Sequence, residues 1–327
     1  MIVVTGGAGF IGSNLVAALE ARGAGPVAVC DRPSDDGKWR NLAKRSLAAV
    51  VAPEDLDAFL AGNRRAIAFV FHLGAISSTT ERNVELILAN NLTPTLRLWQ
   101  WCAEAGVGLV YASSAAVYGD GTQGFDDDPD PAALGRLRPL NPYGWSKLLA
   151  DRRILSLARQ GVRPPRWAGL RFFNVYGPNE QHKGAMQSVV TRNYPLAAAG
   201  KTVTLFRSHR AGIPDGGQQR DFVYVKDCVD VMLWLMERQD AAGIFNLGTG
   251  RARSFAELAT ALFRACGREP AIAYRDTPED VRAHYQYFTQ ARMERLRAAG
   301  YDRPFAAIED GIADYVANHL SRADPFA

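Results

Sequence analysis

The chain has 327 residues, 47% of them hydrophobic, and a formal net charge of +4. This length suits one large domain or two linked ones, and the composition is ordinary for a globular enzyme. No block of Lys or Arg is long enough to follow a phosphate backbone, which argues against nucleic acid and favours small anionic ligands as partners.

The sequence also argues against a membrane protein and a secreted one. No apolar run approaches the roughly 18 residues that cross a bilayer. The chain opens on the apolar stretch MIVVTGG with no charged leader before it, so we expect no signal peptide and a cytoplasmic location. Because the cysteines show neither CxxC pairs nor zinc-ligand spacing, we predict no metal and buried thiols in a reducing compartment at Cys30, Cys102, Cys228 and Cys266.

Short apolar runs alternate with amphipathic stretches through the first half of the chain. The runs predict strands at 2–6, 26–31, 68–74, 108–114 and 167–177, and helices lie between them, for example at 13–22 and 83–104. Strands of four to eight apolar residues separated by helices indicate βαβ units and a parallel sheet covered on both faces. The predicted fold class is α/β, a Rossmann-type doubly wound parallel sheet with a smaller α/β carboxyl-terminal substrate domain.

Two stretches interrupt this alternation. Residues 120–142 are rich in Asp, Pro and Gly and residues 207–219 have no periodicity, so both are predicted loops of a length that is often functional. From about residue 174 the alternation loosens, and 222–237 again predict a strand followed by a helix. We therefore predict a dinucleotide-binding domain over 1–173, which the chain rejoins at about 219–250, and a substrate-binding domain over 174–218 and 251–327.

A glycine-rich stretch, TGGAGFIGSN, lies between the first predicted strand and the first predicted helix. It contains Gly6, Gly9 and Gly12. Missing side chains let the strand and helix pack closely, and the backbone N–H groups at the helix start can hold a pyrophosphate. The pattern alone is weak, but Asp31 ends the second predicted strand at the spacing expected for an acid that binds a ribose. Together these features predict a dinucleotide site.

The charges near Asp31 leave the identity of the dinucleotide open. Asp31 favours the free 2′-hydroxyl of NAD and would repel the 2′-phosphate of NADP. Arg32 and Lys38 follow it and could hold that phosphate as two cations against one anion. We predict NADP, with NAD still possible.

The stretch YGWSK predicts an acid/base pair. Tyr143 and Lys147 are four residues apart, which puts both side chains on one face of a helix, and Pro142 suits its first turn. An ammonium group near a phenol lowers the tyrosine pKa from its usual value of about 10. The tyrosine could then exchange a proton with an alcohol or a ketone. Ser113 and Ser114, at the end of a predicted strand, complete this candidate site.

The stretches TGGAGFIG, FHLGA, ASSAAVYG, YGWSK, RFFNVYGP and RDFVYVKD occur in the order found in the extended short-chain dehydrogenase/reductase family. The chain resembles this family over nearly its whole length. The resemblance implies a dinucleotide domain, a smaller domain for a nucleotide sugar, and Tyr143, Lys147 and Ser114 as catalytic residues. Sugar dehydratases of the family carry an Asp-Glu pair where this chain has Ala115 and Ala116, which argues against dehydration.

Within the family, the stretches GAISSTTE, FNVYGPNEQHKGAM, FNLGTGRARSF, YQYFTQA and LRAAGYDRPF resemble the heptose 6-epimerases. This resemblance implies an ADP-heptose substrate, transient oxidation at C6 with tightly bound NADP that is regenerated each turnover, a role in lipopolysaccharide core biosynthesis, and a homo-oligomer. Two alternatives stay open. One is another nucleotide-sugar epimerase or oxidoreductase, of the 4-epimerase type. The other is a dinucleotide-sensing protein without chemistry, against which the intact Tyr-Lys pair argues.

The resemblance also assigns binding residues by motif. It implies further cofactor contacts at Phe10, Ile11, Leu73, Gly74, Ala75, Ser77, Asn90 and Val175. It implies substrate contacts at Asn174, Ala185, Arg192, Phe206, Arg220 and Tyr285. The guanidinium fork of Arg220 suits a diphosphate because it binds phosphate oxygens bidentately. His72, directly after an apolar run, is expected to be structural.

A second lysine, Lys183 in GPNEQHKG, lies in the predicted loop after the strand at 167–177. Epimerisation at a secondary alcohol presents the oxygen in two positions, and one acid/base cannot lie within about 3 Å of both. The resemblance places a second base, and a cofactor contact, at Lys183. We therefore expect Tyr143 to serve one C6 epimer and Lys183 the other. The chain departs from the family pattern in three places. Ala185 stands where the pattern has a serine, and AAVVA before Pro53 lacks an acid that the family often uses near the adenine. The predicted loops at 120–142 and 207–219 are longer than in the pattern, and all three departures concern ligand recognition.

Overall fold

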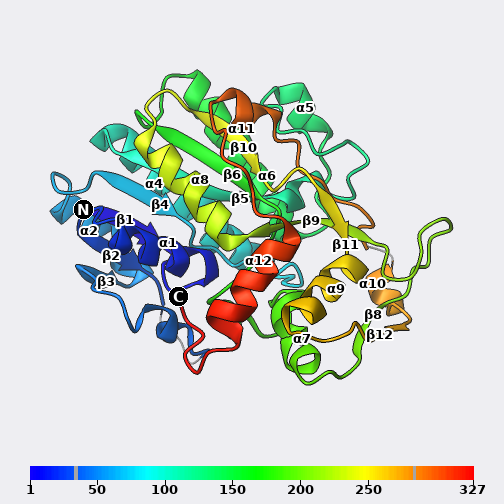
Figure 1. Ribbon diagram of the computed structural model, residues 1–327. Helices are drawn as coiled ribbons and strands as arrows, with labels where there is room; N and C mark the ends of the chain where they lie inside the picture. Colours follow the sequence, from blue (N-terminus) through cyan, green and yellow to red (C-terminus); the bar gives the residue numbers. More distant parts are fainter. Residues whose placement is uncertain (33–35, 283–284) are drawn as a thin grey trace.

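The computed structural model describes residues 1–32, 36–282 and 285–327, and its largest element is a seven-stranded sheet (Figure 1). The strand order is β10-β6-β5-β4-β1-β2-β3, with parallel pairing throughout. The strands are β1 (Ile2–Thr5), β2 (Val27–Cys30), β3 (Ala49–Val51), β4 (Phe69–His72), β5 (Gly108–Ser114), β6 (Trp167–Phe172) and β10 (Gly243–Leu247). The order reverses on the two sides of β1, which is the switch point at which doubly wound sheets bind ligands.

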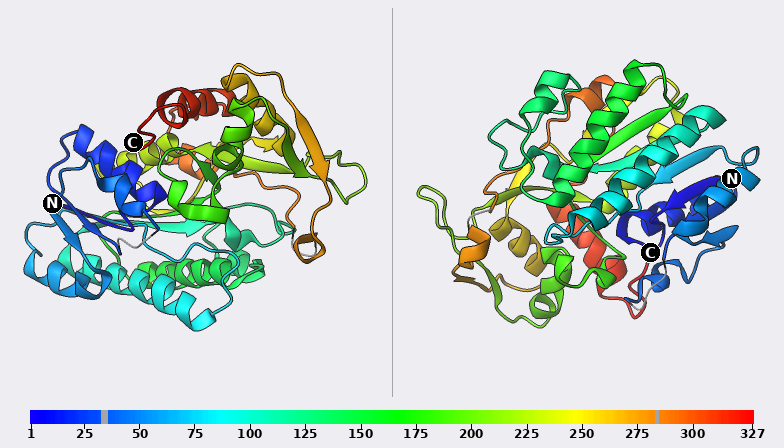
Figure 2. Two further views of the ribbon diagram at one scale, coloured as in Figure 1. Left: turned by 90° about the horizontal axis from the view of Figure 1, so that it is seen from below. Right: turned by 180° about the vertical axis from the view of Figure 1, so that it is seen from behind.

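Helices cover both faces of this sheet, as Figures 1 and 2 show from opposite sides. On one face α1 (Phe10–Ala21) packs against α8 (Val225–Glu237), and on the other α4 (Thr93–Ala105) packs against α6 (Pro142–Arg159). Shorter helices η1 (Lys38–Leu42), η2 (Pro53–Asp55) and α2 (Leu56–Gly62) lie between β2 and β4 in the chain. The predicted fold class, a doubly wound parallel sheet of the Rossmann type, is confirmed.

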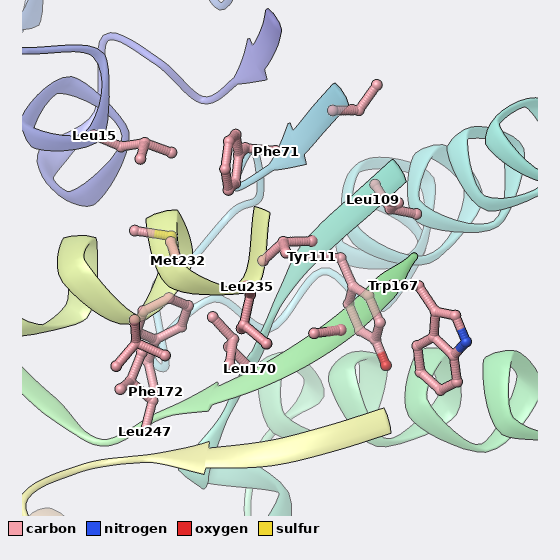
Figure 3. Packing of buried hydrophobic residues seen from close by; sticks show 14 of the residues in the cluster. Leu15, Phe71, Leu109, Tyr111, Trp167, Leu170, Phe172, Met232, Leu235 and Leu247 are labelled. Carbon is pink, nitrogen blue, oxygen red and sulfur yellow. The ribbon is translucent and has the colours of Figure 1, made fainter. Parts of the chain in front are cut away.

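The core of this part lies between the sheet and its helices (Figure 3). Phe71 of β4, Leu109 of β5 and Leu170 of β6 are buried, and Met232 and Leu235 of α8 pack in the same cluster. These strands are apolar at nearly every position because both faces of a parallel sheet are covered. That pattern is why their positions could be predicted from sequence.

A smaller part packs at the carboxyl edge of the sheet. It contains a three-stranded sheet, β11-β9-β7, and a two-stranded sheet, β12-β8, with a separate apolar cluster between them and their helices. Its strands are β7 (Asn174–Tyr176), β8 (Val203–Phe206), β9 (Gln219–Tyr224), β11 (Ala252–Ser254) and β12 (Ile272–Arg275). Its helices are η5 (Gln181–Met186), α7 (Val189–Ala198), α9 (Phe255–Ala265), α10 (Glu279–Arg282), α12 (Ile308–Tyr315) and η6 (Val316–Leu320). In chain order α11 (Glu294–Ala298) precedes α12, and α11 contacts β10 of the large sheet.

The last residues return to the large part beside α1 (Figure 1). The backbone N–H of Ala327 donates to Oδ1 of Asn179 at 2.9 Å, and Lys44 Nζ donates to the carbonyl of Phe326 at 2.8 Å. Residues far apart in the sequence therefore meet next to the start of η5.

The predicted strand at 167–177 is two strands in two different sheets. β6 pairs with β5 and β10, whereas β7 pairs with β9. Phe173 lies between them and its N–H donates to the carbonyl of Leu247 at 3.0 Å, so the chain leaves the large sheet there. An apolar run carries no signal for such a change of sheet. The strand predicted at the start of 222–237 is β9, and it too belongs to the three-stranded sheet and not to the large one. The chain rejoins the large part through α8 and β10.

Two other predictions differ in detail. The predicted loop at 120–142 contains the short helix α5 (Pro131–Arg136), because Asp130 caps it by accepting from the N–H of Ala132 at 2.8 Å. The predicted helix at 83–104 is α3 (Val84–Ile87), a π-helical turn η3 (Leu88–Leu92) and α4. The π-turn contains buried Asn91, whose Oδ1 accepts from the N–H of Ile76 at 2.8 Å. Turns of this kind are frequent at functional sites.

In the described parts of the chain, no helix is both apolar enough and long enough to cross a membrane. All four cysteines are free thiols. Three are buried as predicted, whereas Cys266, which follows α9, is only half-buried.

Candidate active site

The glycine-rich stretch forms the turn between β1 and α1. A Cβ on Gly6 would lie 2.6 Å from the N of Gly74, and one on Gly12 would lie 2.2 Å from the carbonyl oxygen of Gly6. Helix α1 begins after Gly9 and has no side-chain cap, so its first N–H groups remain available. A helix start of this kind binds anions, and the glycines let one approach closely.

These glycines line a cavity of about 520 Å³ at the carboxyl edge of the large sheet. Many of the residues singled out from the sequence line it too: Gly6, Gly9, Phe10, Ile11, Gly12, Asp31, Lys38, Leu73, Gly74, Ala75, Ser77, Ser114, Tyr143, Lys147, Asn174, Val175 and Lys183. The cavity therefore joins side chains from both parts of the fold.

Asp31, directly after β2, accepts hydrogen bonds from Ala8 and Lys38 at this cavity. Its Oδ2 accepts from the N–H of Ala8 at 2.9 Å, and its Oδ1 is 2.9 Å from Lys38 Nζ. Arg32 instead pairs with Glu54 at 3.0 Å on the surface. Arg32 and Asn90 line an adjoining pocket of about 230 Å³, which shares Gly6, Asp31, Lys38, Gly74 and Ala75 with the main cavity.

Helix α6 carries Tyr143 and Lys147, the candidate acid/base pair. Asn141 caps the helix by accepting from the N–H of Gly144 at 2.8 Å, and Pro142 occupies its first turn. Lys147 is buried, and its Nζ donates to the carbonyl of Ala112 at 2.8 Å. Burial lowers the pKa of Lys147 to about 8, although the negative charge of Asp151 opposes this.

The pKa of Tyr143 shifts in the direction opposite to the sequence-based expectation. Burial raises the pKa of Tyr143, and a hydrogen bond with the Ser114 hydroxyl only partly opposes this. The ammonium of Lys147 is 6.0 Å from the centre of the Tyr143 ring and points to the carbonyl of Ala112. Burial and the Ser114 hydrogen bond, and not the Lys147 ammonium, therefore determine the pKa shift of Tyr143 in this arrangement.

A buried ion pair between α6 and β6 was missed by the sequence analysis. Asp151 and Arg171 have no exposed side-chain surface, and Arg171 Nε is 2.9 Å from Asp151 Oδ2. The same carboxylate accepts from the Ser113 hydroxyl at 2.9 Å and from the Tyr111 hydroxyl at 3.1 Å. An arginine inside the apolar run of β6, and an acid one helical turn after Lys147, were the available signals.

Lys183 reaches the cavity from η5. Its Nζ is 5.0 Å from the centre of the Phe10 ring, and burial lowers the pKa of Lys183. The loop is held by Glu180, a fully buried carboxylate that accepts from the Ser188 hydroxyl and the Thr191 hydroxyl, both at 2.6 Å. His182, which the sequence analysis did not single out, also lines the cavity.

The remaining predicted residues do not line the cavity. Ala185 and Arg192 are exposed. Arg220, Phe206 and Tyr285 form a separate cluster. The guanidinium carbon of Arg220 lies 5.4 Å from the centre of the Tyr285 ring and 5.7 Å from that of Phe255, and Phe206 meets Tyr285 edge-on at 6.3 Å. Because Phe255 does line the cavity, this cluster adjoins its wall.

His72 is a structural residue. It is buried at the end of β4, with its ring nitrogens 2.7 Å from the Thr5 hydroxyl and 2.9 Å from the Thr95 hydroxyl. Burial lowers its pKa to about 3, so the ring is neutral. In residues 1–32, 36–282 and 285–327, no group of three or more His, Cys, Asp or Glu side chains is placed to hold a metal ion.

A glycine loop at the first βα turn, an acid at the end of β2 and a Tyr-Lys pair at the carboxyl edge define a class of protein: α/β proteins that bind a dinucleotide beside an acid/base. The profile of the NAD dependent epimerase/dehydratase family matches residues 2–248. The chain belongs to this family, which confirms the resemblance found in the sequence.

Within this family, the chain is similar over its full length to enzymes of one activity. The chain is 47% identical over 328 residues to the ADP-L-glycero-D-manno-heptose-6-epimerase of Nitratidesulfovibrio vulgaris (strain DP4), and all of both chains is covered. It is 41% identical over 334 residues to the enzyme of the same name from Fusobacterium nucleatum, again with full coverage of both.

Solved structures agree with this. The structure of the Helicobacter pylori ADP-L-glycero-D-manno-heptose-6-epimerase has a TM-score of 0.78 at 33% identity and covers 97% of this chain and 95% of its own. The UDP-glucose 4-epimerase of Thermus thermophilus in complex with NAD has a TM-score of 0.72 at 30% identity, with 95% and 96% covered.

Proposed function

We propose that this protein is an ADP-glyceromanno-heptose 6-epimerase, which interconverts ADP-D-glycero- and ADP-L-glycero-D-manno-heptose in lipopolysaccharide core biosynthesis. One observation carries the proposal: Tyr143 of α6 and Lys183 of η5 line the same cavity, in a chain 41–47% identical over its full length to enzymes of that name. The two C6 epimers present the reacting oxygen in different positions. One group within about 3 Å of the first position cannot reach the second, so two proton carriers from two elements suit this reaction.

The two carriers have suitable chemistry. Burial raises the pKa of Tyr143 and lowers the pKa of Lys183, in each case by disfavouring the charged form. Each group can give a proton to the reacting oxygen in one direction of the reaction and take it back in the other. Lys147 supplies a positive charge to the cavity that Tyr143 also lines. Ser114, at the end of β5, orients the phenol.

The residues present fit a nicotinamide dinucleotide. The glycine loop leaves room for a pyrophosphate, and the uncapped start of α1 supplies N–H donors. When bound, the dinucleotide accepts a hydride from the sugar and returns it. We propose NADP over NAD, because Lys38 lies at the ribose-binding acid Asp31, with Arg32 beside it.

For the sugar nucleotide we propose that Arg220 binds the diphosphate, with Phe206 and Tyr285 around it. Arg220 is buried against two aromatic rings, which leaves its guanidinium in fixed orientation. Asn174, which lines the cavity, would contact the sugar, and the exposed residues Ala185 and Arg192 would border the bound substrate on the η5–α7 side. We also propose that the protein acts in the cytoplasm as a homo-oligomer, which light scattering on the purified protein would test.

Proton NMR of the purified protein with ADP-D-glycero-D-manno-heptose and no added dinucleotide tests the reaction. We expect the L-glycero epimer to appear at C6 with no net change in nicotinamide absorbance. Steady, stoichiometric consumption of dinucleotide would contradict an epimerase. The likeness to a UDP-glucose 4-epimerase favours one second candidate, a 4-epimerase. Turnover of UDP-glucose at C4 in the same assay, with ADP-heptose unchanged, would establish that activity instead.

A further inference from the structure

A chain of buried hydrogen bonds leads from the carboxyl end of β5 toward the smaller part of the fold. The hydroxyl of Ser113 donates to Asp151 at 2.9 Å, and Arg171 pairs with the same carboxylate at 2.9 Å. Arg171 Nη1 donates to the Tyr118 hydroxyl at 3.0 Å, and that hydroxyl donates to Oδ1 of Asn246 at 2.6 Å. Tyr118 lies in η4 (Ala115–Tyr118), directly after the strand that ends in the site serines.

Asn246 of β10 connects this series of hydrogen bonds to the segment 285–293. Its Nδ2 donates to the carbonyl of Arg292 at 3.0 Å and to the carbonyl of Phe125 at 2.8 Å. The Asn246 side chain is fully buried, so its amide hydrogens pair within the protein. The amide orientation is therefore set by these carbonyls on one side and by the Tyr118 hydroxyl on the other.

A second contact joins the same turn to the same segment. The carbonyl of Gly119 accepts from Nε2 of Gln286, and the carbonyl of Gln286 accepts from Nη2 of Arg220. Gly119 has φ +64, and a Cβ there would lie 1.8 Å from the carbonyl oxygen of Arg138, so the turn admits only glycine. The segment that includes Tyr285 is thus bonded directly to Gly119 near one end and is connected to Tyr118, through Asn246, near the other.

We propose that Tyr118 is a positioning residue, which holds the segment 285–293, and through it Tyr285 and Arg220, at a fixed place relative to the catalytic strand β5. The inference rests on the proposed function, in which Arg220 binds the diphosphate. Burial raises the pKa of Tyr118 to about 12, so its hydroxyl remains a donor to Asn246.

The variant Tyr118→Phe removes only the hydroxyl. The ring keeps its packing against Phe125, at 5.5 Å between centres, and against Phe173, at 6.2 Å. Tyr301→Phe is the matched control, because Tyr301 is equally buried and its hydroxyl donates to Asp230 at 2.9 Å, away from the cavity.

Hydrogen exchange tests the attachment itself. In Tyr118→Phe we expect peptides within 285–293 to exchange about tenfold faster than in the unaltered protein, and no such change in Tyr301→Phe. Equal exchange of these peptides in both variants would overturn the proposal.

Ligand binding tests the consequence. Tyr118→Phe should weaken ADP-D-glycero-D-manno-heptose binding and raise KM about tenfold, while kcat and the affinity for NADP stay within about threefold. A merely destabilised protein would lose both ligands or lose kcat, and that result would overturn a positioning role. If the unaltered protein does not bind ADP-heptose, the proposed function fails, whereas the exchange contrast still decides whether Tyr118 holds the segment.

Discussion

At the scale of single residues, the contacts of each lysine side chain in the cavity determine which step of the reaction it can serve. Lys147 is buried and donates to a backbone carbonyl, Lys183 lies over the Phe10 ring, and Lys38 contacts the Asp31 carboxylate. Three lysines in one cavity therefore have three different environments. Their substitution should affect different steps.

Replacing Lys183 by alanine should stop epimerisation, because the second oxygen position loses its proton carrier. With one C6 epimer, Lys183→Ala should still reduce the bound dinucleotide in a single turnover, and with the other it should not. Tyr143→Phe should show the opposite epimer preference. Stopped-flow absorbance measures both, with Lys201→Ala, an exposed lysine of the smaller part, as the control. Near-normal epimerisation by Lys183→Ala would show that this lysine carries no proton in the reaction.

Replacing Lys38 by alanine should weaken NADP more than NAD. The 2′-phosphate loses a charge-assisted contact, which costs about 1–3 kcal/mol, and the unpaired Asp31 carboxylate then repels it. Dissociation constants from calorimetry measure the difference. Lys44→Ala, an exposed neighbour paired with Asp324, is the control and should leave both constants unchanged. An equal loss for both dinucleotides would show that Lys38 does not contact the 2′-phosphate.

The depressed pKa of Lys147 predicts how stability depends on pH. With a pKa of about 8 in the folded protein, Lys147 releases its proton at a lower pH than in the unfolded chain, where its pKa is 10.5. Between pH 8 and pH 10.5 the unfolded chain binds more protons than the folded one, so the free energy of unfolding rises with pH, by about 3 kcal/mol in total. This gain is lost as the pH falls back through 8. Urea unfolding of Lys147→Met should lack this rise, while Lys201→Met should keep it. Parallel pH curves for Lys147→Met and the unaltered protein would contradict the burial of this charge.

At the scale of elements, the loop from β7 to α7 determines where Lys183 lies. Glu180 accepts from the N–H of Ser188 at 2.5 Å, as well as from two hydroxyls, and so ties the start of η5 to the start of α7. Asn179, at φ +71, is buried and donates to the Ser13 hydroxyl at 2.9 Å. The loop is therefore anchored by polar side chains on both sides of the lysine.

Replacing Glu180 by glutamine should loosen this loop. Glutamine has one acceptor oxygen in place of two, so the partly buried donors of Ser188 and Thr191 lose a partner at a cost of about 1–3 kcal/mol. We expect a lower free energy of unfolding, and a kcat that falls more than the affinity for NADP. Urea unfolding and steady-state kinetics measure these. Glu237→Gln, which removes an exposed ion pair with Arg22, should change neither. Unchanged kcat in Glu180→Gln would show that the loop does not need this anchor.

At the scale of the whole molecule, the cavity lies where the two apolar clusters meet. The large cluster spans the seven-stranded sheet and its helices, and the smaller one includes Phe10 of α1 together with residues of α7, α9 and α12. We expect a dinucleotide bound at the glycine loop to contact residues of both parts, because both line the cavity. Binding should therefore stabilise the folded chain as a unit.

Saturating NADP should raise the free energy of unfolding by about 2.7 kcal/mol at a concentration 100 times its Kd. Gly12→Ala should lose this increase, because its Cβ would meet the backbone of Gly6 at 2.2 Å and displace the loop. Gly135→Ala, in α5 with nothing within 4 Å of its Cβ, should keep it. Thermal unfolding with and without NADP measures both. An undiminished NADP shift in Gly12→Ala would contradict dinucleotide binding at this loop.

The sequence by itself determined the α/β class, the glycine loop and the shared helix face of Tyr143 and Lys147. These depend on local patterns: apolar runs for strands buried on both faces, glycines where no Cβ fits, and a spacing of four residues on a helix. The family resemblance followed from the same stretches.

Only the tertiary structure decided which distant residues meet. It placed Lys183 over Phe10, left Arg192 at the surface, joined Asp151 to Arg171, and connected Tyr118 to residues 285–293 through Asn246. It also divided the apolar run at 167–177 between two sheets. Each of these outcomes depends on contacts between segments far apart in the chain, and no local spacing or periodicity encodes which buried donor will find which acceptor.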